Sequence, residues 1–239
     1  MPIHIHAEQG QIAKVVLLPG DPQRAEYIAR KYFKDPVKYT DYRLMYGFTG
    51  SYNNLPISIQ TTGMGTPSLS IVVEELVTLG VEVLIRIGTC GAISSTVDIG
   101  DIICTVASSS SHDIFSQRFN NAAFSASSDF YLNSILLQSA KSHNKKLIMG
   151  DILTSETFYE ENLDLYRKFA SYGVLAVEME SYALFGLAKK YGKRAAALLT
   201  VSDKVFEQKR ASSDLILGGV NSMVEIILSS LKDIYDLIQ

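Results

Sequence analysis

Residues 173–188 read GVLAVEMESYALFGLA and join a strand pattern directly to a helix pattern. The small, apolar run 173–177 is typical of a buried strand, and residues 181–188 have the apolar content of a packed helix. Glu178 and Glu180 therefore lie where a strand leaves a sheet, the usual place for ligands in open α/β sheets. A carboxylate there is suited to accept hydrogen bonds from two neighbouring hydroxyls, as a ribose presents them. The alternative is that both are acidic residues at a helix start, where the helix dipole favours them.

The rest of the chain continues this alternation. Strands are expected over residues 15–18, 46–52, 56–61, 83–87, 101–107, 146–149 and 194–201. Helices are expected over residues 23–33, 67–79 and 130–142, from about 180 onward, and over an amphipathic tail, 221–238. Strands that alternate with helices predict an α/β fold with a mixed, largely parallel central sheet flanked by helices on both faces. Because no linker rich in Pro, Gly or Ser divides the chain, residues 1–239 are expected to form a single domain.

Composition narrows the class of protein. With 239 residues, 47% hydrophobic and 20% charged, the chain is typical of a globular protein with a full core. A formal net charge of −3 gives no general attraction to nucleic acid or anionic membranes, so an anionic substrate requires a local arginine cluster. We find no secretory signal and no apolar run near the ~18 residues that span a bilayer. The two cysteines, Cys90 and Cys104, show no pairing pattern, which predicts a reduced, cytoplasmic protein.

Two arginines stand where an anion would bind. The segment 20–24, GDPQR, follows a strand and opens a helix, so free backbone N–H groups and Arg24 are expected to face an anion. Arg86 lies inside an apolar strand, and because an unpaired buried cation is costly, it must meet an anion. The glycines of 88–91 allow close backbone approach, and Thr89 adds a hydroxyl donor. The alternatives are a plain turn with a surface arginine for the first motif and a structural carboxylate for the second.

Asp203 follows an apolar strand at its carboxyl end, where catalytic groups tend to lie in such folds. An acid at this place is suited to act as a general acid, and the alternative is a turn cap or a pair with Lys204. Phe158 and Tyr159 are either a stacking platform or part of the core. Cys90 is expected to be a small buried residue rather than a reactive thiol. No cluster has metal-ligand spacing, so no metal site is expected.

Several short segments, none decisive alone, form a specific set through their order. They are LPGDPQR at 18–24, Arg43 before YGFTG at 46–50, GMGTPS at 63–68, RIGTCGA at 86–92, FY at 158–159, VEME at 177–180 and VSD at 201–203. Together they resemble the bacterial, high-molecular-mass type of purine nucleoside phosphorylase, within the nucleoside phosphorylase superfamily. The resemblance extends over nearly the whole chain, from His4 to the terminal helix.

The resemblance implies phosphorolysis, in which a purine (deoxy)ribonucleoside and phosphate give the free base and (deoxy)ribose 1-phosphate. Asp203 would protonate N7 of the purine as the base leaves. The residues implied to bind phosphate are Gly20, Arg24, Arg86 and Thr89, with Arg43 from a neighbouring subunit. Those implied to bind the nucleoside are Met179 and Glu180 at the ribose, His4 at the sugar from the same neighbour, Phe158 and Val177 at the base, and Met64, Cys90, Gly91, Glu178 and Ser202 beside them. Family members of this type are hexamers built as three dimers, and the expected co-substrate is inorganic phosphate, without a cofactor.

The chain departs from the family pattern after Asp203, where a polar loop with an arginine that swings toward the catalytic aspartate is expected. Ungapped alignment of the terminal helices puts Ile216 at the arginine position, and Arg210 comes several residues earlier. We hypothesise that Arg210 takes the catalytic role through a reshaped loop; the alternative is that Asp203 acts unaided. A second departure is the serine run 108–111, expected to be a short loop, where the family usually has a Thr-Asp pair.

Other functions within and outside the superfamily remain alternatives. A uridine phosphorylase would carry a Gln and an Arg near residues 155–165, whereas this segment is acidic and Arg167 comes later, which favours a purine. A hydrolytic nucleosidase has no need of the phosphate arginines. A nucleoside-binding protein with impaired catalysis would fit the missing arginine in 204–216. The motifs leave open both the choice between 6-oxo and 6-amino purines and the use of methylthioadenosine.

Overall fold

A computed structural model describes residues 2–112 and 114–239. The strands are β1 (Val15–Leu18), β2 (Lys34–Thr40), β3 (Gly47–Tyr52), β4 (Leu55–Gln60), β5 (Val83–Ala92), β6 (Ile102–Ser110), β7 (Ala126–Ser127), β8 (Ile148–Thr154), β9 (Ala176–Glu178), β10 (Arg194–Lys204) and β11 (Lys209–Arg210). The helices are α1 (Pro22–Tyr32), α2 (Thr66–Thr78), α3 (Phe130–Ser142), α4 (Asp164–Ser171), α5 (Ser181–Lys190), α6 (Ser213–Ser229) and α7 (Leu231–Asp236), with 3₁₀ turns η1 (Tyr42–Leu44) and η2 (Ser116–Phe119). The strands form one mixed sheet in the order β11-β10-β6-β8-β9-β5-β1-β4-β3-β2, and β7 pairs with β6.

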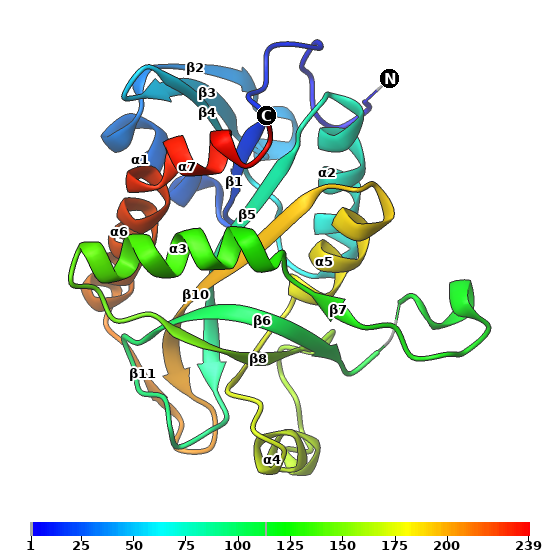
Figure 1. The fold of residues 1–239 in the computed structure, drawn as a ribbon. Coiled ribbons are helices and arrows are strands. Elements are labelled where there is room, and N and C mark those ends of the chain that lie inside the picture. Colours follow the sequence, from blue (N-terminus) through cyan, green and yellow to red (C-terminus); the bar gives the residue numbers. More distant parts are fainter. Residues whose placement is uncertain (1, 113) are drawn as a thin grey trace.

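Helices cover both faces of this sheet, as predicted (Figure 1). One core lies between the sheet and α1, α3, α6 and α7, and the other between the sheet and α2 and α5. The short strand β1 shows the division. Val15 and Leu17 belong to the first core and Val16 and Leu18 to the second, because successive side chains of a strand point to opposite faces.

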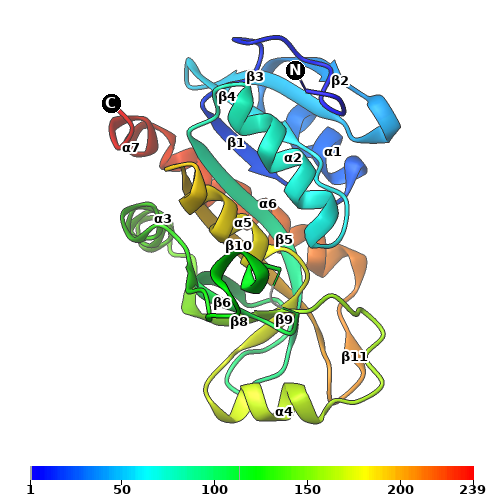
Figure 2. The ribbon, with the colours of Figure 1, turned by 90° about the vertical axis from the view of Figure 1, so that its right-hand side faces the viewer.

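The long strands β5 and β10 pair in parallel along their length and then take part in a closed ring. β10 also pairs with β6, β6 with β8, β8 with β9, and β9 with the end of β5. All five strands contribute to an apolar cluster that includes Cys90, Ile103, Ile152, Ala176 and Leu199. Figure 2 shows α4 and β11 at the end of the molecule toward which β5 and β10 run. The ring of strands thus holds the carboxyl ends of β5 and β10 at the same end of the molecule as α4 and β11.

Most predicted elements are confirmed within a few residues. α3 coincides with the predicted helix, and Asn53 and Asn54 connect β3 to β4 with φ values of 48° and 63°. Asn tolerates this left-handed region, which two-residue hairpin turns require. The tail differs from the prediction, because α6 begins at Ser213 instead of residue 221. Ser212 caps α6 by accepting a hydrogen bond from the N–H of Leu215.

Several differences concern strands. β8 runs from Ile148 to Thr154, where the prediction ended at 149, and the two-residue strands β7 and β11 were not predicted. β5 continues past Ile87 to Ala92, since its end finds partners in both β9 and β10. The loop expected at 108–111 is wrong, because residues 108–110 complete β6 and pair with β7 and β8. β2, an edge strand rich in exposed side chains, was not predicted. Within the described ranges, no helix has both the length and the apolar character to cross a membrane.

Candidate active site

A cavity of about 990 Å³ opens at the carboxyl ends of β5 and β10. Its lining includes the residues predicted to bind phosphate, namely Gly20, Arg24, Arg43, Arg86 and Thr89. It also includes those predicted at the nucleoside, namely Met64, Cys90, Gly91, Phe158, Val177, Glu178, Met179, Glu180 and Ser202, and the proposed catalytic residues Asp203 and Arg210. His4 is the predicted site residue that does not line it. The fold therefore gathers side chains from distant segments at the sheet edge where ligands are expected.

Arg86 is the charged centre of this cavity. Its side chain is 5% exposed and lies between two carboxylates, with Nε 2.9 Å from Glu178 Oε2 and Nη2 2.5 Å from Glu180 Oε2. Burial disfavours its charge, but attraction to Glu180 and Glu178 outweighs burial and the pKa of Arg86 is raised. Gly88 leaves room for the guanidinium, since a Cβ there would lie 2.8 Å from Nη2. The carboxylate interpretation of Arg86 is confirmed, and phosphate binding at the same cation stays a prediction.

The two carboxylates of the VEME motif have different surroundings. Glu178 accepts hydrogen bonds from the N–H groups of Glu180 and Ser181, at the start of α5, and from the hydroxyl of Thr154 at 2.6 Å. Glu178 therefore serves the helix start, as the alternative interpretation of the motif predicts. Glu180 accepts from the N–H of Gly65 at 2.5 Å. Burial raises the pKa of Glu180, attraction to Arg86 opposes this, and repulsion from Glu178 adds to it. Of the two, Glu180 is better placed to exchange its partners for substrate hydroxyls.

The start of α1 forms a second cationic wall. Asp21 caps this helix by accepting from the N–H of Gln23 at 2.8 Å. Arg24 in the first turn is half-buried, with Nη1 3.4 Å from the carbonyl oxygen of Ile87. Burial lowers the pKa of Arg24, Asp21 opposes this, and the positive charge of Arg86 adds to it. The positive charges of Arg24 and Arg86 repel each other inside the cavity. An anion bound between them would offset this repulsion.

Asp203 lies within β10, just beyond an irregularity in register after Val201. Bulges of this kind redirect side chains and are frequent beside active sites. Its Oδ1 accepts a hydrogen bond from the hydroxyl of Ser202 at 2.7 Å. Opposite it in β5 is Gly91, where a Cβ would lie 2.7 Å from Asp203 Oδ2. A residue without a side chain at this position is therefore required for the carboxyl group to lie where it does.

The segment after Asp203 forms a hairpin. β11 pairs antiparallel with the end of β10, and Arg210 lies directly opposite Asp203. Residues opposite each other in such a pair project to the same face of the sheet with Cβ atoms about 5 Å apart. Lys204 is the alternative partner of Asp203, but its Nζ instead lies 2.9 Å from Oδ1 of Asp98. Ile216 lies in α6 and is not among the residues that line the cavity.

The aromatic pair and the cysteine differ in burial. Phe158 and Tyr159 are 67% and 86% exposed, so the core interpretation is wrong for both. Their rings meet edge to face with centroids 5.0 Å apart at the cavity. Cys90 is buried as predicted, and burial raises the pKa of its thiol, which makes it a poor nucleophile.

His4 and Arg43 both lie beside the ring of Tyr42 but differ in their relation to the cavity. His4 Nδ1 is 2.8 Å from Glu75 of α2, outside the lining, which explains how a residue so close to the terminus is held. Arg43 borders the cavity from η1 with a left-handed backbone, φ 53° and ψ 26°. Its guanidinium lies 5.6 Å from the centre of the Tyr42 ring. One chain thus brings Arg43, but not His4, to its own cavity.

Sequence reasoning missed part of the lining. The additional residues are mainly Ser155, Thr157, Glu160, Leu163 and Tyr166 before and within α4, and Lys204, Gln208 and Lys209 of the hairpin. Two features of the sequence could have indicated these residues. Those before and within α4 lie close to the FY pair at 158–159, and those of the hairpin lie close to or within the basic pair at 209–210. In the part of the chain that the structure describes, no group of three or more His, Cys, Asp or Glu side chains is arranged to hold a metal ion.

Comparison with known proteins covers nearly all of the chain. The model of the phosphorylase superfamily matches residues 14–224, which include β5, β9, β10 and β11 around the cavity. A protein of Brevibacillus brevis named purine nucleoside phosphorylase DeoD-type is 45% identical over 231 residues, covering 96% of this chain and 98% of the relative. A protein of the same name from Bacillus cytotoxicus is 42% identical over 231 residues with the same coverage.

Proposed function

The chain belongs to the phosphorylase superfamily, and on this premise we propose that it cleaves purine (deoxy)ribonucleosides with phosphate, giving the free base and (deoxy)ribose 1-phosphate. The observation that supports this most strongly is the content of one cavity. Arg24 and Arg86 suit a phosphate dianion, Glu180 suits a ribose diol, and Asp203 suits a leaving base. Inorganic phosphate is the proposed co-substrate, and no cofactor is part of the proposal.

The phosphate is proposed to bind at the cationic wall. Arg24 and Arg86 would supply charge, Thr89 a hydroxyl, and the backbone at Gly20 close approach before α1. In a half-buried site such charges act more strongly than in water. Phosphate bound there lies below the sugar, where it stabilises positive charge at C1′ and attacks the same atom.

The nucleoside is proposed to lie in the cavity, across the carboxyl ends of β5 and β10. Glu180 and Met179 would hold the ribose, and Phe158 and Val177 would face the base. As the bond between C1′ and the purine breaks, its electron pair moves onto the base. Asp203 then gives its proton to N7, so the base leaves neutral. A phosphate oxygen forms the new bond to C1′.

Arg210 is proposed to assist Asp203 from the opposite strand. We expect Arg210→Ala to lower kcat by about tenfold, equivalent to ~1.4 kcal/mol of transition-state stabilisation. The expected cause is the loss of a cation on the same face as the catalytic carboxyl. Ile216→Ala, the matched control at the family's arginine position, is expected to leave kcat unchanged. Steady-state kinetics with inosine check both, and an unaltered kcat in Arg210→Ala would mean that Asp203 acts unaided.

The assembly is proposed to be a hexamer of three dimers, in which His4 and Arg43 serve the cavity of the neighbouring subunit. The place of His4, which binds Glu75 and lies outside the cavity of its own chain, supports its part in this assembly. Arg43 lines the cavity of its own chain, so its role at the neighbouring subunit has no such support. The cytoplasmic location stays a prediction, and the two cysteines, both free and buried, are compatible with it.

Purified protein incubated with inosine, adenosine and uridine in phosphate buffer tests the substrate class. We expect free base from the purine nucleosides and little from uridine, measured by chromatography. Release from uridine alone would favour a uridine phosphorylase. Binding of nucleoside without release of base would favour a binding protein with impaired catalysis, and would assign the loss to the segment 204–216.

A further inference from the structure

Glu75 of α2 ties the N-terminal segment to the fold. Its carboxylate accepts hydrogen bonds from the N–H groups of Ile3 at 3.0 Å, His4 at 3.0 Å and Ile5 at 2.7 Å. The imidazole Nδ1 of His4 adds a contact of 2.8 Å. Burial alone would raise the pKa of Glu75, but the hydrogen bonds from His4 and from these backbone groups outweigh it and the pKa is lowered. Three consecutive N–H groups that converge on one carboxylate hold the chain in a defined curve.

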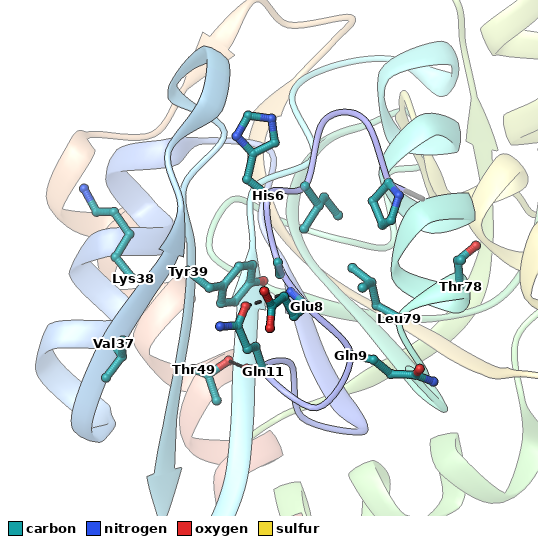
Figure 3. Close-up of a pocket in the computed structure, with 13 residues that line it drawn as sticks. His6, Glu8, Gln9, Gln11, Val37, Lys38, Tyr39, Thr49, Thr78 and Leu79 are labelled. Atoms are coloured by element: carbon teal, nitrogen blue, oxygen red, sulfur yellow. Dashed lines mark hydrogen bonds between the residues drawn. The ribbon is translucent and has the colours of Figure 1, made fainter.

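The other restraints on this segment are weaker. The N–H of His6 donates to Thr40 Oγ1 at 3.3 Å, and the ring of His4 lies 6.5 Å from that of Tyr42. Ile5 is 2% exposed and packs into the core beside α2 and α5. The segment, from Pro2 to Gln11, borders a second cavity of about 990 Å³, separate from the site described above. Figure 3 shows this cavity between Lys38 and Tyr39 of β2 on one side and Leu79 after α2 on the other. A segment with a cavity along one side has little packing to fix it there. The hydrogen bonds that place His4 therefore come from Glu75.

The same anchor reaches Arg43 through aromatic contacts. The ring of His6 stacks on Tyr42 with centroids 4.5 Å apart and an interplanar angle of 27°. The guanidinium of Arg43 lies near the same Tyr42 ring, at 5.6 Å from its centre. Left-handed backbone at a residue other than glycine needs support from its surroundings. The segment that Glu75 holds thus also contacts the residue that precedes Arg43.

We propose that Glu75 is a positioning residue for the reaction, which orients His4 for use at the neighbouring subunit's site. The inference rests on the proposed function, in which the side chain of His4 contacts the sugar. Glu75 itself touches neither substrate.

A double-mutant cycle tests the proposal. Glu75→Gln keeps the side-chain shape but replaces one accepting oxygen with an amide NH₂, which repels the converging N–H groups. We expect Glu75→Gln and His4→Ala each to lower kcat/KM by about tenfold, and the double variant to be no more than about twofold below His4→Ala. Losses that multiply to about a hundredfold would overturn the proposal, because independent residues have additive free energies.

Glu74→Gln is the matched control. Glu74 is the neighbouring residue of α2 and bonds instead to Lys190 and Tyr191. We expect it to leave kcat/KM unchanged. If Glu75→Gln gives little folded protein, Glu75→Asp takes its place. This variant keeps the charge but shortens the side chain by one methylene. We expect a smaller decrease in kcat/KM than for Glu75→Gln, and the same non-additivity with His4→Ala.

Hydrogen exchange provides a readout that does not depend on activity. Glu75→Gln is expected to speed exchange of the amides of residues 3–5 by about tenfold or more, and Glu74→Gln is not. Unchanged protection of residues 3–5 in Glu75→Gln would overturn the anchoring role. If the wild-type chain showed no phosphorolysis, the proposed function would fail, whereas the exchange result would still decide whether Glu75 holds His4.

Discussion

Asp203→Asn is expected to lower kcat for inosine by about 10²–10⁴-fold, the usual contribution of a positioned general acid. The amide keeps the shape and the hydrogen bond from Ser202 but has no proton to give to N7. Nucleoside binding is expected to persist, because the proposed ribose and phosphate contacts come from other residues. Steady-state kinetics and a direct binding measurement separate the two effects.

A nucleoside that already carries a methyl group on N7 sharpens this test. Its base leaves neutral without protonation, so the chemistry requires no acid at N7. Asp203→Asn is expected to act on this substrate at nearly the wild-type rate. The matched control is Asp98→Asn, since Asp98 pairs with Lys204 of the same strand end. If the variant were equally impaired on both substrates, Asp203 would have a role other than proton transfer.

Arg86→Ala is expected to destabilise the protein by about 3–5 kcal/mol, because it leaves Glu178 and Glu180 buried without their cation. For a chain of this size that corresponds to a fall in Tm of ~6–20 °C. Phosphate binding is expected to weaken as well. Thermal denaturation and the KM for phosphate measure the two consequences.

Arg24→Ala provides the comparison within the same cavity. Arg24 donates to a backbone carbonyl at 3.4 Å and, among the residues that the structure describes, has no carboxylate partner as close as those of Arg86. Its removal is expected to weaken phosphate binding with a loss of stability below ~1 kcal/mol. Equal stability of the two variants would contradict the structural role assigned to Arg86.

The elements predicted well are those whose signals are local. The helix 130–142 has its periodicity and its cap in adjacent residues, with Asp129 accepting from the N–H of Leu132. The extension of β5 through Gly88 depends on partners in β9 and β10, and glycine by itself favours the end of a strand. Likewise, Ser108 stays in β6 because its hydroxyl bonds to that of Thr154.

The candidate site likewise combines features that local sequence predicts with features that depend on the fold. Burial in an apolar strand was enough to predict that Arg86 meets an anion, but the identity of that anion depends on the fold. Glu178 and Glu180 come about ninety residues later and reach Arg86 because β9 pairs with the end of β5. The register that puts Arg210 opposite Asp203 follows from the hairpin, since sequence spacing alone does not select a register.

Release of base from inosine, measured with and without phosphate and with the sugar product identified, decides whether this cavity performs phosphorolysis. The proposed function predicts that release requires phosphate and that the sugar appears as ribose 1-phosphate. Equal release without phosphate, with free ribose as the product, would contradict it and would remove the role assigned to Arg24 and Arg86.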